Sequence, residues 1–209
     1  MRGCLGVCLG ERYRYTASID NLSHAITHTK KALQVTDFDH TDQAVYLTHL
    51  GSLTNAKHHR TGSMEDLEQG IEYAQEAVRI TTAGHRDRAL FLHNLANRFG
   101  DKFGRTSSFE DLQQAITLAQ EAVYLTHPNS PNRAIYQNHL GGRLGDRYEQ
   151  TGSMEDLELA ITHTREAIQL TPFGHVNRAL YLSNMGGRLR QKFERTGSID
   201  DLDQALVCT

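Results

Sequence analysis

The chain has 209 residues, of which 38% are hydrophobic and 22% are charged, and its net charge is −3. This composition predicts a soluble chain that is long enough to bury a core. The small net charge, with an isoelectric point near 6.4, argues against nucleic-acid and anionic-membrane binding, and no apolar run approaches the roughly 20 residues of a membrane-spanning helix. Cys4, Cys8 and Cys208 form neither a disulfide framework nor a paired CxxC zinc motif, which favours a reducing, cytoplasmic location.

One phrase recurs along the chain at a fixed interval. Thr-Gly-Ser-Met-Glu-Asp-Leu stands at residues 61–67 and again at 151–157. Looser versions stand at residues 16–22, 106–112 and 196–202, so that successive closing leucines are always 45 residues apart. A constant period of this length predicts a stacked repeat array.

The same phrase predicts a corner between two helices. A glycine or small residue ends one helix, because glycine enters the left-handed conformation freely. The serine then caps the next helix, and the acids in the first turn suit the positive end of the helix dipole. The serine-to-acid capping spacing is present in Ser63 with Asp66, Ser153 with Asp156 and Ser198 with Asp201.

Each repeat is predicted to contain two helices, which we call helix A and helix B. In the second full repeat, helix A covers approximately residues 86–105 and helix B approximately residues 109–126, because apolar residues recur at helical spacing in both. Proline and glycine in the links after helix B stop that helix and turn the chain back. No alternating strand pattern is present, so the expected fold class is all-α.

We expect one domain over residues 1–209, because the period runs through nearly every residue. Aligned on this period, the chain begins inside a helix A and ends inside a helix B, which indicates a fragment of a longer protein. The expected repeats are approximately 1–37 (partial), 41–82, 86–127, 131–172 and 176–209 (partial).

These residues resemble the tetratricopeptide (TPR) family. The helix A part of its pattern is matched by Leu182, Met185, Gly186 and Leu189, and the helix B part by Ala160, Thr164, Ala167 and Pro172. The chain departs from the pattern in having no tryptophan, in Gln137, and in a longer repeat than the usual 34 residues. The resemblance implies an α-solenoid of antiparallel helix pairs wound into a right-handed superhelix. Phrases such as Leu-Gly-Gly-Arg-Leu look like the long repeats of fungal multidomain proteins that carry an NB-ARC domain or a caspase-like CHAT protease domain.

The histidines are not expected to form a metal or catalytic site. His40, His85 and His175 recur in the links one repeat apart, too far from each other to share an ion, so we predict that they cap or pack the links. His24 and His28 stand on one helix face, but no third ligand and no HExxH pattern accompanies them.

Other motifs of enzymes and cofactor sites are also absent from the sequence. It contains no phosphate-binding glycine loop, no dinucleotide-binding fingerprint and no nucleophile elbow. Cys4 and Cys8 are interpreted as ordinary helix A positions, and His58 and His59 as solvated surface residues. We therefore expect no enzyme activity, no cofactor and no metal.

Polar residues on helix A, beside the packing leucine, form the candidate binding surface. In a TPR-like superhelix such positions face the concave groove, where a peptide would lie. The candidates are Asn94, Asn97, Arg98, Asn138, His139, Arg143, Asn184 and Arg188. The asparagine and histidine positions vary between repeats, as a ligand-reading surface should. The arginines have an alternative interpretation, in which Arg98 with Asp101 and Arg143 with Asp146 form surface i,i+3 ion pairs.

The favoured function is a protein–protein interaction scaffold that binds a peptide or partner domain in this groove. The alternative is a regulatory array of a larger NB-ARC or CHAT protein, without activity in this fragment. No nucleic-acid or membrane partner is expected. Uncapped terminal repeats expose apolar faces, so end-to-end self-association is a further expectation.

Overall fold

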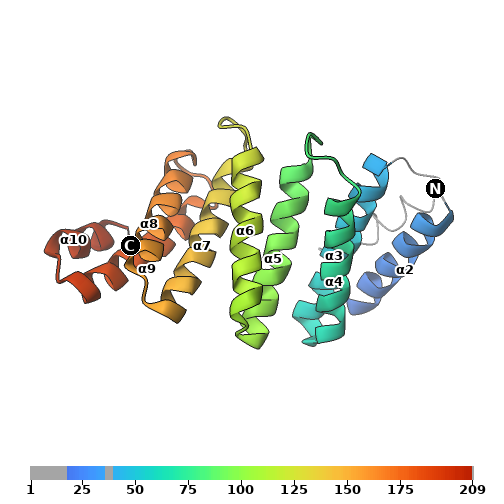
Figure 1. Ribbon diagram of the computed structural model, residues 1–209, viewed down its shortest axis with the longest axis horizontal. Coiled ribbons are helices and arrows are strands. Elements are labelled where there is room, and N and C mark those ends of the chain that lie inside the picture. Colours follow the sequence, from blue (N-terminus) through green and yellow to red (C-terminus); the bar gives the residue numbers. More distant parts are fainter. Residues whose placement is uncertain (1–17, 36–39, 209) are drawn as a thin grey trace. The chain divides into compact units, whose positions relative to one another are not determined.

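The computed structural model describes residues 18–35 and 40–208, and all regular secondary structure within them is α-helical (Figure 1). The helices are α2 (Ile19–Val35), α3 (His40–Thr61), α4 (Met64–Arg79), α5 (Arg88–Thr106), α6 (Phe109–Leu125), α7 (Arg133–Thr151), α8 (Met154–Gln169), α9 (Arg178–Thr196) and α10 (Ile199–Val207). Odd-numbered helices are A helices and even-numbered ones are B helices. The all-α prediction is confirmed, and α5 and α6 lie within two residues of their predicted bounds. Cys4, Cys8 and the 36–39 link lie outside the described residues.

The chain forms two compact units, residues 1–107 and 108–209. In the N-terminal unit, α3 packs against α2 and α4, and α5 packs against α4 and α3. In the C-terminal unit, α7 packs against α6 and α8, and α9 packs against α8, α10 and α7. Consecutive A and B helices are thus antiparallel neighbours within each unit. That the two units form one continuous array stays a prediction from the unbroken period.

The predicted helix–helix corners are confirmed in their capping and in their backbone geometry. Gly62, Gly152 and Gly197 have φ values of 72°, 70° and 71°, in the left-handed region that glycine enters freely. The serine that follows each of them accepts a hydrogen bond from the backbone N–H of the acid three residues later, at 3.2–3.4 Å. Ser107 takes the glycine position of the remaining corner with φ 55°, a conformation that costs more for a residue with a Cβ.

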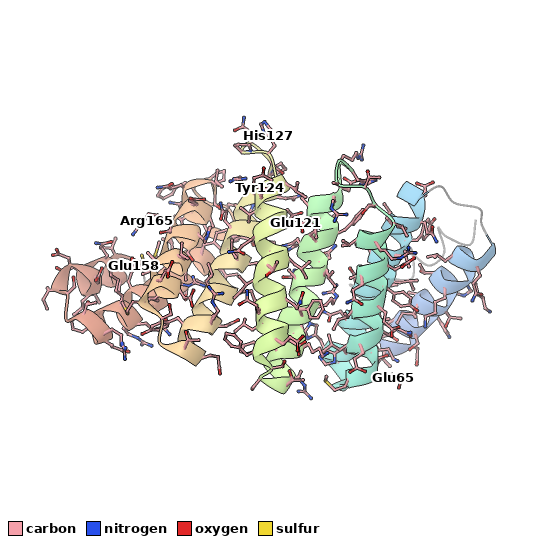
Figure 2. The ribbon with its side chains drawn as sticks, in the orientation of Figure 1. Glu65, Glu121, Tyr124, His127, Glu158 and Arg165 are labelled. Atoms are coloured by element: carbon pink, nitrogen blue, oxygen red, sulfur yellow. The ribbon has the colours of Figure 1, made fainter. Side chains whose placement is uncertain are left out.

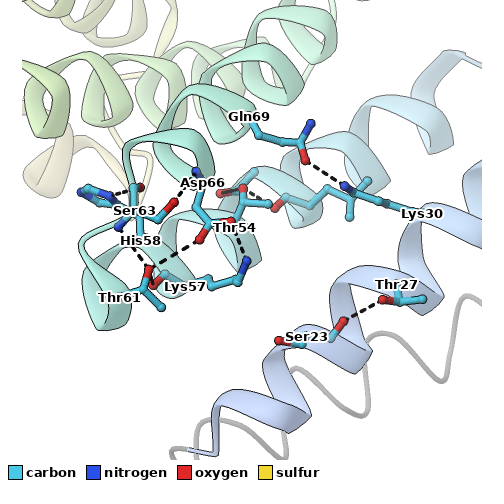
Figure 3. A network of polar contacts seen from close by, with 12 residues as sticks. Ser23, Thr27, Lys30, Thr54, Lys57, His58, Thr61, Ser63, Asp66 and Gln69 are labelled. Carbon is cyan, nitrogen blue, oxygen red and sulfur yellow. Dashed lines mark hydrogen bonds and ion pairs between the residues drawn. The ribbon is translucent and has the colours of Figure 1, made fainter.

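An ion pair crosses each of three corners, which the sequence reasoning did not predict. The partners are Lys57 with Asp66 at 2.7 Å, Arg147 with Asp156, and Lys192 with Asp201 at 3.5 Å. In every case the basic residue lies nine positions before the acid, on the last turns of the A helix. The capping acid therefore contacts a cation of the preceding helix as well as its own helix dipole. Figure 3 shows this arrangement around Lys57 and Asp66.

The prediction of a solvated surface is wrong for His58. This side chain is 4% exposed, and its Nδ1 lies 2.7 Å from the carbonyl oxygen of Ser63 (Figure 3). Because a carbonyl only accepts, Nδ1 must donate this bond. In the other repeats Phe103, Tyr148 and Phe193 occupy this position. His58 thus stands at a position that is aromatic in these repeats, where Tyr148 is also buried and Phe103 and Phe193 are partly buried.

The core of each repeat contains the leucine that closes the corner phrase. Leu22, Leu67, Leu112 and Leu157 are all fully buried. In the C-terminal unit, Leu157 packs in a cluster whose other large members are Tyr148, Ile161, Met185 and Leu189. This cluster joins α7, α8 and α9, so the A helices of successive repeats are held through the B helix between them.

Three of the links between repeats are closed by an arginine at the start of the following A helix, which is α5, α7 or α9. Arg88, Arg133 and Arg178 each donate two Nη1 hydrogen bonds, at 2.5–3.1 Å, to carbonyl oxygens at the end of the preceding B helix. Helix C-termini carry partial negative charge, and their last carbonyl oxygens have lone pairs left to accept further hydrogen bonds. The cation satisfies both demands, so we call these residues the clamp arginines.

The predicted capping role of the link histidines is confirmed where the structure describes their side chains. His85 Nδ1 accepts the backbone N–H of Asp87 at 3.1 Å, and His175 Nδ1 accepts that of Asn177 at 3.2 Å. Ser130 replaces histidine in the third link and accepts the N–H of Asn132 at 3.3 Å. These short bonds fix the turn that leads into each A helix.

Candidate binding surface on the A helices

Charge is divided between the two kinds of helix. In the N-terminal unit, α5 carries four basic residues and one acid, whereas α4 carries five acids and one basic residue. In the C-terminal unit, α9 carries five basic residues and one acid, whereas α8 carries four acids and one basic residue. Helices α6 and α10 carry acids only. Figure 2 labels Glu65, Glu121 and Glu158 on three B helices. From α3 to α10 the A helices are therefore the more basic helices, whereas the B helix α2 carries Lys30 and Lys31 against the single acid Asp20.

Arg188 is the more buried of the two candidate arginines in the C-terminal unit. Its side chain is 8% exposed, and Nη1 donates to the buried Thr164 Oγ1 at 2.5 Å. The guanidinium lies against α7, since a Cβ built on Gly145 would meet its Nε at 3.5 Å. Burial lowers the pKa of Arg188 to about 10, and the charges of Asp146 and Glu149 oppose this. Within the described residues, no carboxylate lies within ion-pair distance of this cation.

Arg98 occupies the equivalent place in the N-terminal unit, where α5 meets α3. It is 7% exposed, and within the described part of the chain its buried Nε has no hydrogen-bond partner. The residue equivalent to Thr164 here is Ala74, which offers no hydroxyl acceptor. Burial lowers the pKa of Arg98, and the charge of Asp101 opposes this. Arg98 is thus a buried cation whose polar atoms are not fully satisfied.

The alternative interpretation of the arginines as a surface ladder is confirmed for one pair and wrong for the other. Arg143 Nη1 lies 2.9 Å from Asp146 Oδ2, and both side chains are about one-third exposed. Arg98 is buried instead, because successive A helices pack on this turn. Asp101, its expected partner, lies 3.5 Å from Nε2 of His59 on α3. Burial of Asp146 raises the pKa of its carboxyl group, and the charge of Arg143 opposes this.

The candidate asparagines fall into two groups. Asn184 Nδ2 donates to Asn138 Oδ1 at 3.0 Å, which joins α9 to α7. Asn97 Nδ2 lies 3.0 Å from Nε2 of His93, within α5. Asn94 on α5 and His139 on α7 occupy equivalent positions in successive repeats, and both are half-buried. The structure therefore brings Asn138 and Asn184 together in the C-terminal unit, and places Asn94, Asn97 and Arg98 on consecutive turns of α5.

A buried polar network replaces apolar packing between α7 and α8. Gln137, 1% exposed, donates from Nε2 to a carboxylate oxygen of Glu166. Its Oε1 accepts from Nδ1 of His163 at 2.6 Å. In the other repeats a leucine stands in place of Gln137. Because the amide oxygen only accepts, His163 must carry a proton on Nδ1, and its neutral form satisfies this requirement.

This network predicts a pH-dependent stability. Burial lowers the pKa of His163 below its usual 6.5, as does the nearby Arg133, while the charge of Glu166 opposes the shift. The unfolded chain therefore binds this proton first as the pH falls. The stabilisation is complete above pH 6.5 and is lost as the pH falls through the folded-state pKa.

Replacing His163→Gln should make the free energy of unfolding less sensitive to pH between 7.5 and 5, measured by urea denaturation. An unchanged pH slope in the variant would contradict the assignment.

Two features of this surface were missed in the sequence although a signal for each was present. The clamp arginines recur 45 residues apart in Arg-Ala dipeptides at the start of α5, α7 and α9, with Gln43-Ala44 at the corresponding place in α3. The division of charge is visible when acids and bases are counted helix by helix rather than over the whole chain. The net charge of −3 conceals it.

No protein-family model and no curated protein matches the sequence. Solved structures do match its fold. Nearly identical TPR-like repeats from Podospora anserina, assigned there as a kinesin light chain, have a TM-score of 0.67 at 14% identity, covering 100% of this chain and 96% of that one. BtubC (BKLC) from P. vanneervenii has a TM-score of 0.66 at 14% identity, covering 100% and 85%. YrrB, a TPR protein with an unusual peptide-binding site, has a TM-score of 0.59 at 17% identity, covering 94% and 82%.

The chain has a TPR-like helical-repeat fold. At these identities the likeness establishes the fold and not the ligand. TPR-like arrays generally serve as protein-binding scaffolds, because stacked repeats create extended surfaces. In residues 18–35 and 40–208, no helix combines the length and hydropathy of a membrane span. The same residues contain no cluster of three or more metal-ligating side chains.

Proposed function

We propose that this TPR-like chain is a protein-interaction scaffold whose A helices bind acidic peptide segments. The observation that carries the proposal is the division of charge, with an acidic excess on α4, α6, α8 and α10 and a basic excess on α5 and α9. An acidic segment would be attracted to the A helices and repelled by the B helices. No enzyme activity is part of the proposal.

The buried arginines suggest how such a segment is recognised. Arg98 and Arg188 have lost most of their hydration without gaining a carboxylate partner within the described residues. A charged group in this condition is stabilised by an anion, and a guanidinium group donates two parallel hydrogen bonds to a carboxylate. Asn94 and Asn184 lie on the same turns and supply amides of the kind that bond to a peptide backbone. Within the C-terminal unit, specificity would then come from Arg143 and Arg188 and register from Asn184. In the N-terminal unit Arg98 and Asn94 would have the same roles.

The test is selection of a random peptide library on the whole chain, followed by affinity measurement. Peptides with two or more aspartates or glutamates should be enriched, and their affinity should fall as salt is raised. The double variant Arg143→Gln with Arg188→Gln should weaken binding about tenfold or more, since a hydrogen bond to a charged group contributes about 1.5 kcal/mol or more.

Arg165→Gln is the matched control, because it removes one positive charge from the exposed side of α8 (Figure 2). It should leave the affinity nearly unchanged. Thermal melts of all variants separate loss of binding from loss of folding. Enrichment of neutral or basic peptides, or equal weakening by Arg165→Gln and the double variant, would overturn the proposal.

A larger context is proposed from the sequence resemblance alone. The chain would then be a cytoplasmic regulatory array in a fungal protein with an NB-ARC or CHAT domain, and reading the transcript beyond Thr209 tests this directly. End-to-end self-association is also proposed, because Val207 and Leu206 on α10 are 86% and 65% exposed. A Val207→Asp variant should abolish such association in light scattering.

A further inference from the structure

The edge of the C-terminal unit that carries the links has a pocket of its own. The α6–α7 link (residues 126–132) and the α8–α9 link (residues 170–177) lie at the same ends of their helices (Figure 1). Between them is a cleft of about 450 Å³. Its apolar lining consists of Pro131, Ala134, Ile135, Leu170, Pro172 and Tyr181. The A-helix surface proposed to bind peptides contributes none of these residues, so this cleft is a separate feature.

An exposed aromatic side chain stands beside this pocket. Phe173 is 94% exposed and follows Pro172, which lines the cleft. Its ring lies 4.8 Å from the guanidinium carbon of Arg178, and that clamp arginine is itself fixed by two backbone carbonyls. Val176, in the same link, is 85% exposed. The Phe173 ring is therefore exposed to solvent, and the link that carries it is fixed by the hydrogen bonds of Arg178.

The repeat itself does not require these apolar residues. In the N-terminal unit Ala83 and Arg86 occupy the positions of Phe173 and Val176. In that link His85 still caps the turn, and Arg88 still bonds to the carbonyl oxygen of Val78, although both bulky apolar residues are missing. A bulky apolar side chain that the fold does not use, next to an apolar cleft, is characteristic of an interaction surface.

The charges at this edge favour a second copy of the chain as the partner. Apart from His127 and His175, neither link contains an acidic or basic residue, and the adjacent Arg133 and Arg178 are bonded to carbonyls. Two copies that meet through this edge therefore oppose no carboxylates and no lysines. Two copies that meet through their B helices would oppose acid to acid, and two that meet through α9 would oppose base to base. In addition, one link supplies both a projecting ring and part of a pocket, which is the self-complementarity that a two-fold contact needs.

We propose that the link edge of the C-terminal unit is a contact between two copies of this chain, in which Phe173 of each copy enters the cleft of the other. An aromatic residue buries roughly 150–250 Å², and two of them give a contact well below the roughly 1,600 Å² of a standard interface. The dimer is accordingly weak and depends on concentration. The candidate peptide-binding residues of the A helices, such as Arg143 and Arg188, do not line this contact.

Sedimentation velocity of the whole chain over a wide concentration range tests this. The wild type should shift from monomer to dimer. Phe173→Ser removes the ring and Ala134→Trp fills the cleft, so each variant alone should remain monomeric. Tyr124→Ser is the matched control, since Tyr124 is 86% exposed in the same unit but does not line the cleft, and it should dimerise as the wild type does.

Mixing the two defective variants gives the sharpest result. The Ala134→Trp copy keeps its ring and the Phe173→Ser copy keeps its cleft, so the mixture has one intact contact and should form heterodimers. Folding of both variants is checked by circular dichroism. A wild type that stays monomeric at every concentration would overturn the proposal. So would a dimer that survives Phe173→Ser, and if Val207→Asp dissolves that dimer, the contact is end-to-end instead.

Discussion

Replacing Arg133→Met should lower the free energy of unfolding by about 2–3 kcal/mol, because the clamp arginine donates two charge-assisted hydrogen bonds to carbonyl oxygens at the end of α6. The bonds run from Nη1 to Val123 O at 3.1 Å and to Thr126 O at 2.6 Å. Hydrogen bonds to a charged group contribute about 1.5–3 kcal/mol, and the cation also faces the negative end of the α6 dipole. Chemical denaturation gives the difference directly.

Two further variants separate the clamp from a general effect of charge. Arg133→Lys keeps the charge but loses the planar fork, so its stability should lie between those of the wild type and Arg133→Met. Arg165→Met removes an equal charge from the exposed side of α8 (Figure 2), and a surface substitution of this kind should change stability by less than about 0.5 kcal/mol. Equal losses in Arg133→Met and Arg165→Met would show that the clamp contributes nothing of its own.

Two glycine-to-alanine substitutions in equivalent kinds of helix should have opposite signs. On Gly141 in α7, a Cβ would meet Thr164 Oγ1 at 2.8 Å and the backbone oxygen of Ala160 at 3.0 Å. Backbone cannot move aside, so α7 and α8 would have to separate, at a cost of about 1–3 kcal/mol. On Gly187 in α9, a Cβ would meet nothing within 4 Å. There alanine should stabilise the chain by roughly 0.5–1 kcal/mol through helix propensity.

Thermal unfolding of the two variants, Gly141→Ala and Gly187→Ala, checks this pair. Each serves as the control for the other, since the chemical change is identical and only the surroundings differ. The melting temperature should fall for the first and rise for the second. A rise in both would mean that the A and B helices do not approach as closely as the structure has them.

The features that the sequence predicts are those set by local chemistry. The corner glycines and capping serines recur with the period, and each acts within a few residues of itself, so pattern alone locates them. The histidine caps at His85 and His175 belong to the same class. Gly141 also stands at the Leu-Gly position of the TPR pattern, and its close contact with α8 supplies the physical reason.

The features that the sequence did not predict depend on which helices meet. Arg98 was expected on the surface as well as in the groove, and its burial arises only because α5 packs against α3. The interpretation of His58 as a surface residue rests on the adjacent His58 and His59 pointing apart on a helix, but the equivalent position in the later repeats is aromatic. The ion pairs of Lys57 and Arg147 join residues that are nine positions apart in the sequence. These residues come close only because the corner packs one helix against the next.

The most direct test of the proposed function is hydrogen exchange of the whole chain with and without a selected acidic peptide. If acidic segments bind the A helices, added protection should appear in α5, α7 and α9, around residues 94–98, 138–143 and 184–188. The B helices α4, α6 and α8 should exchange as they do in the free chain. Protection confined to the B helices, or none at a peptide concentration that saturates binding, would contradict the account.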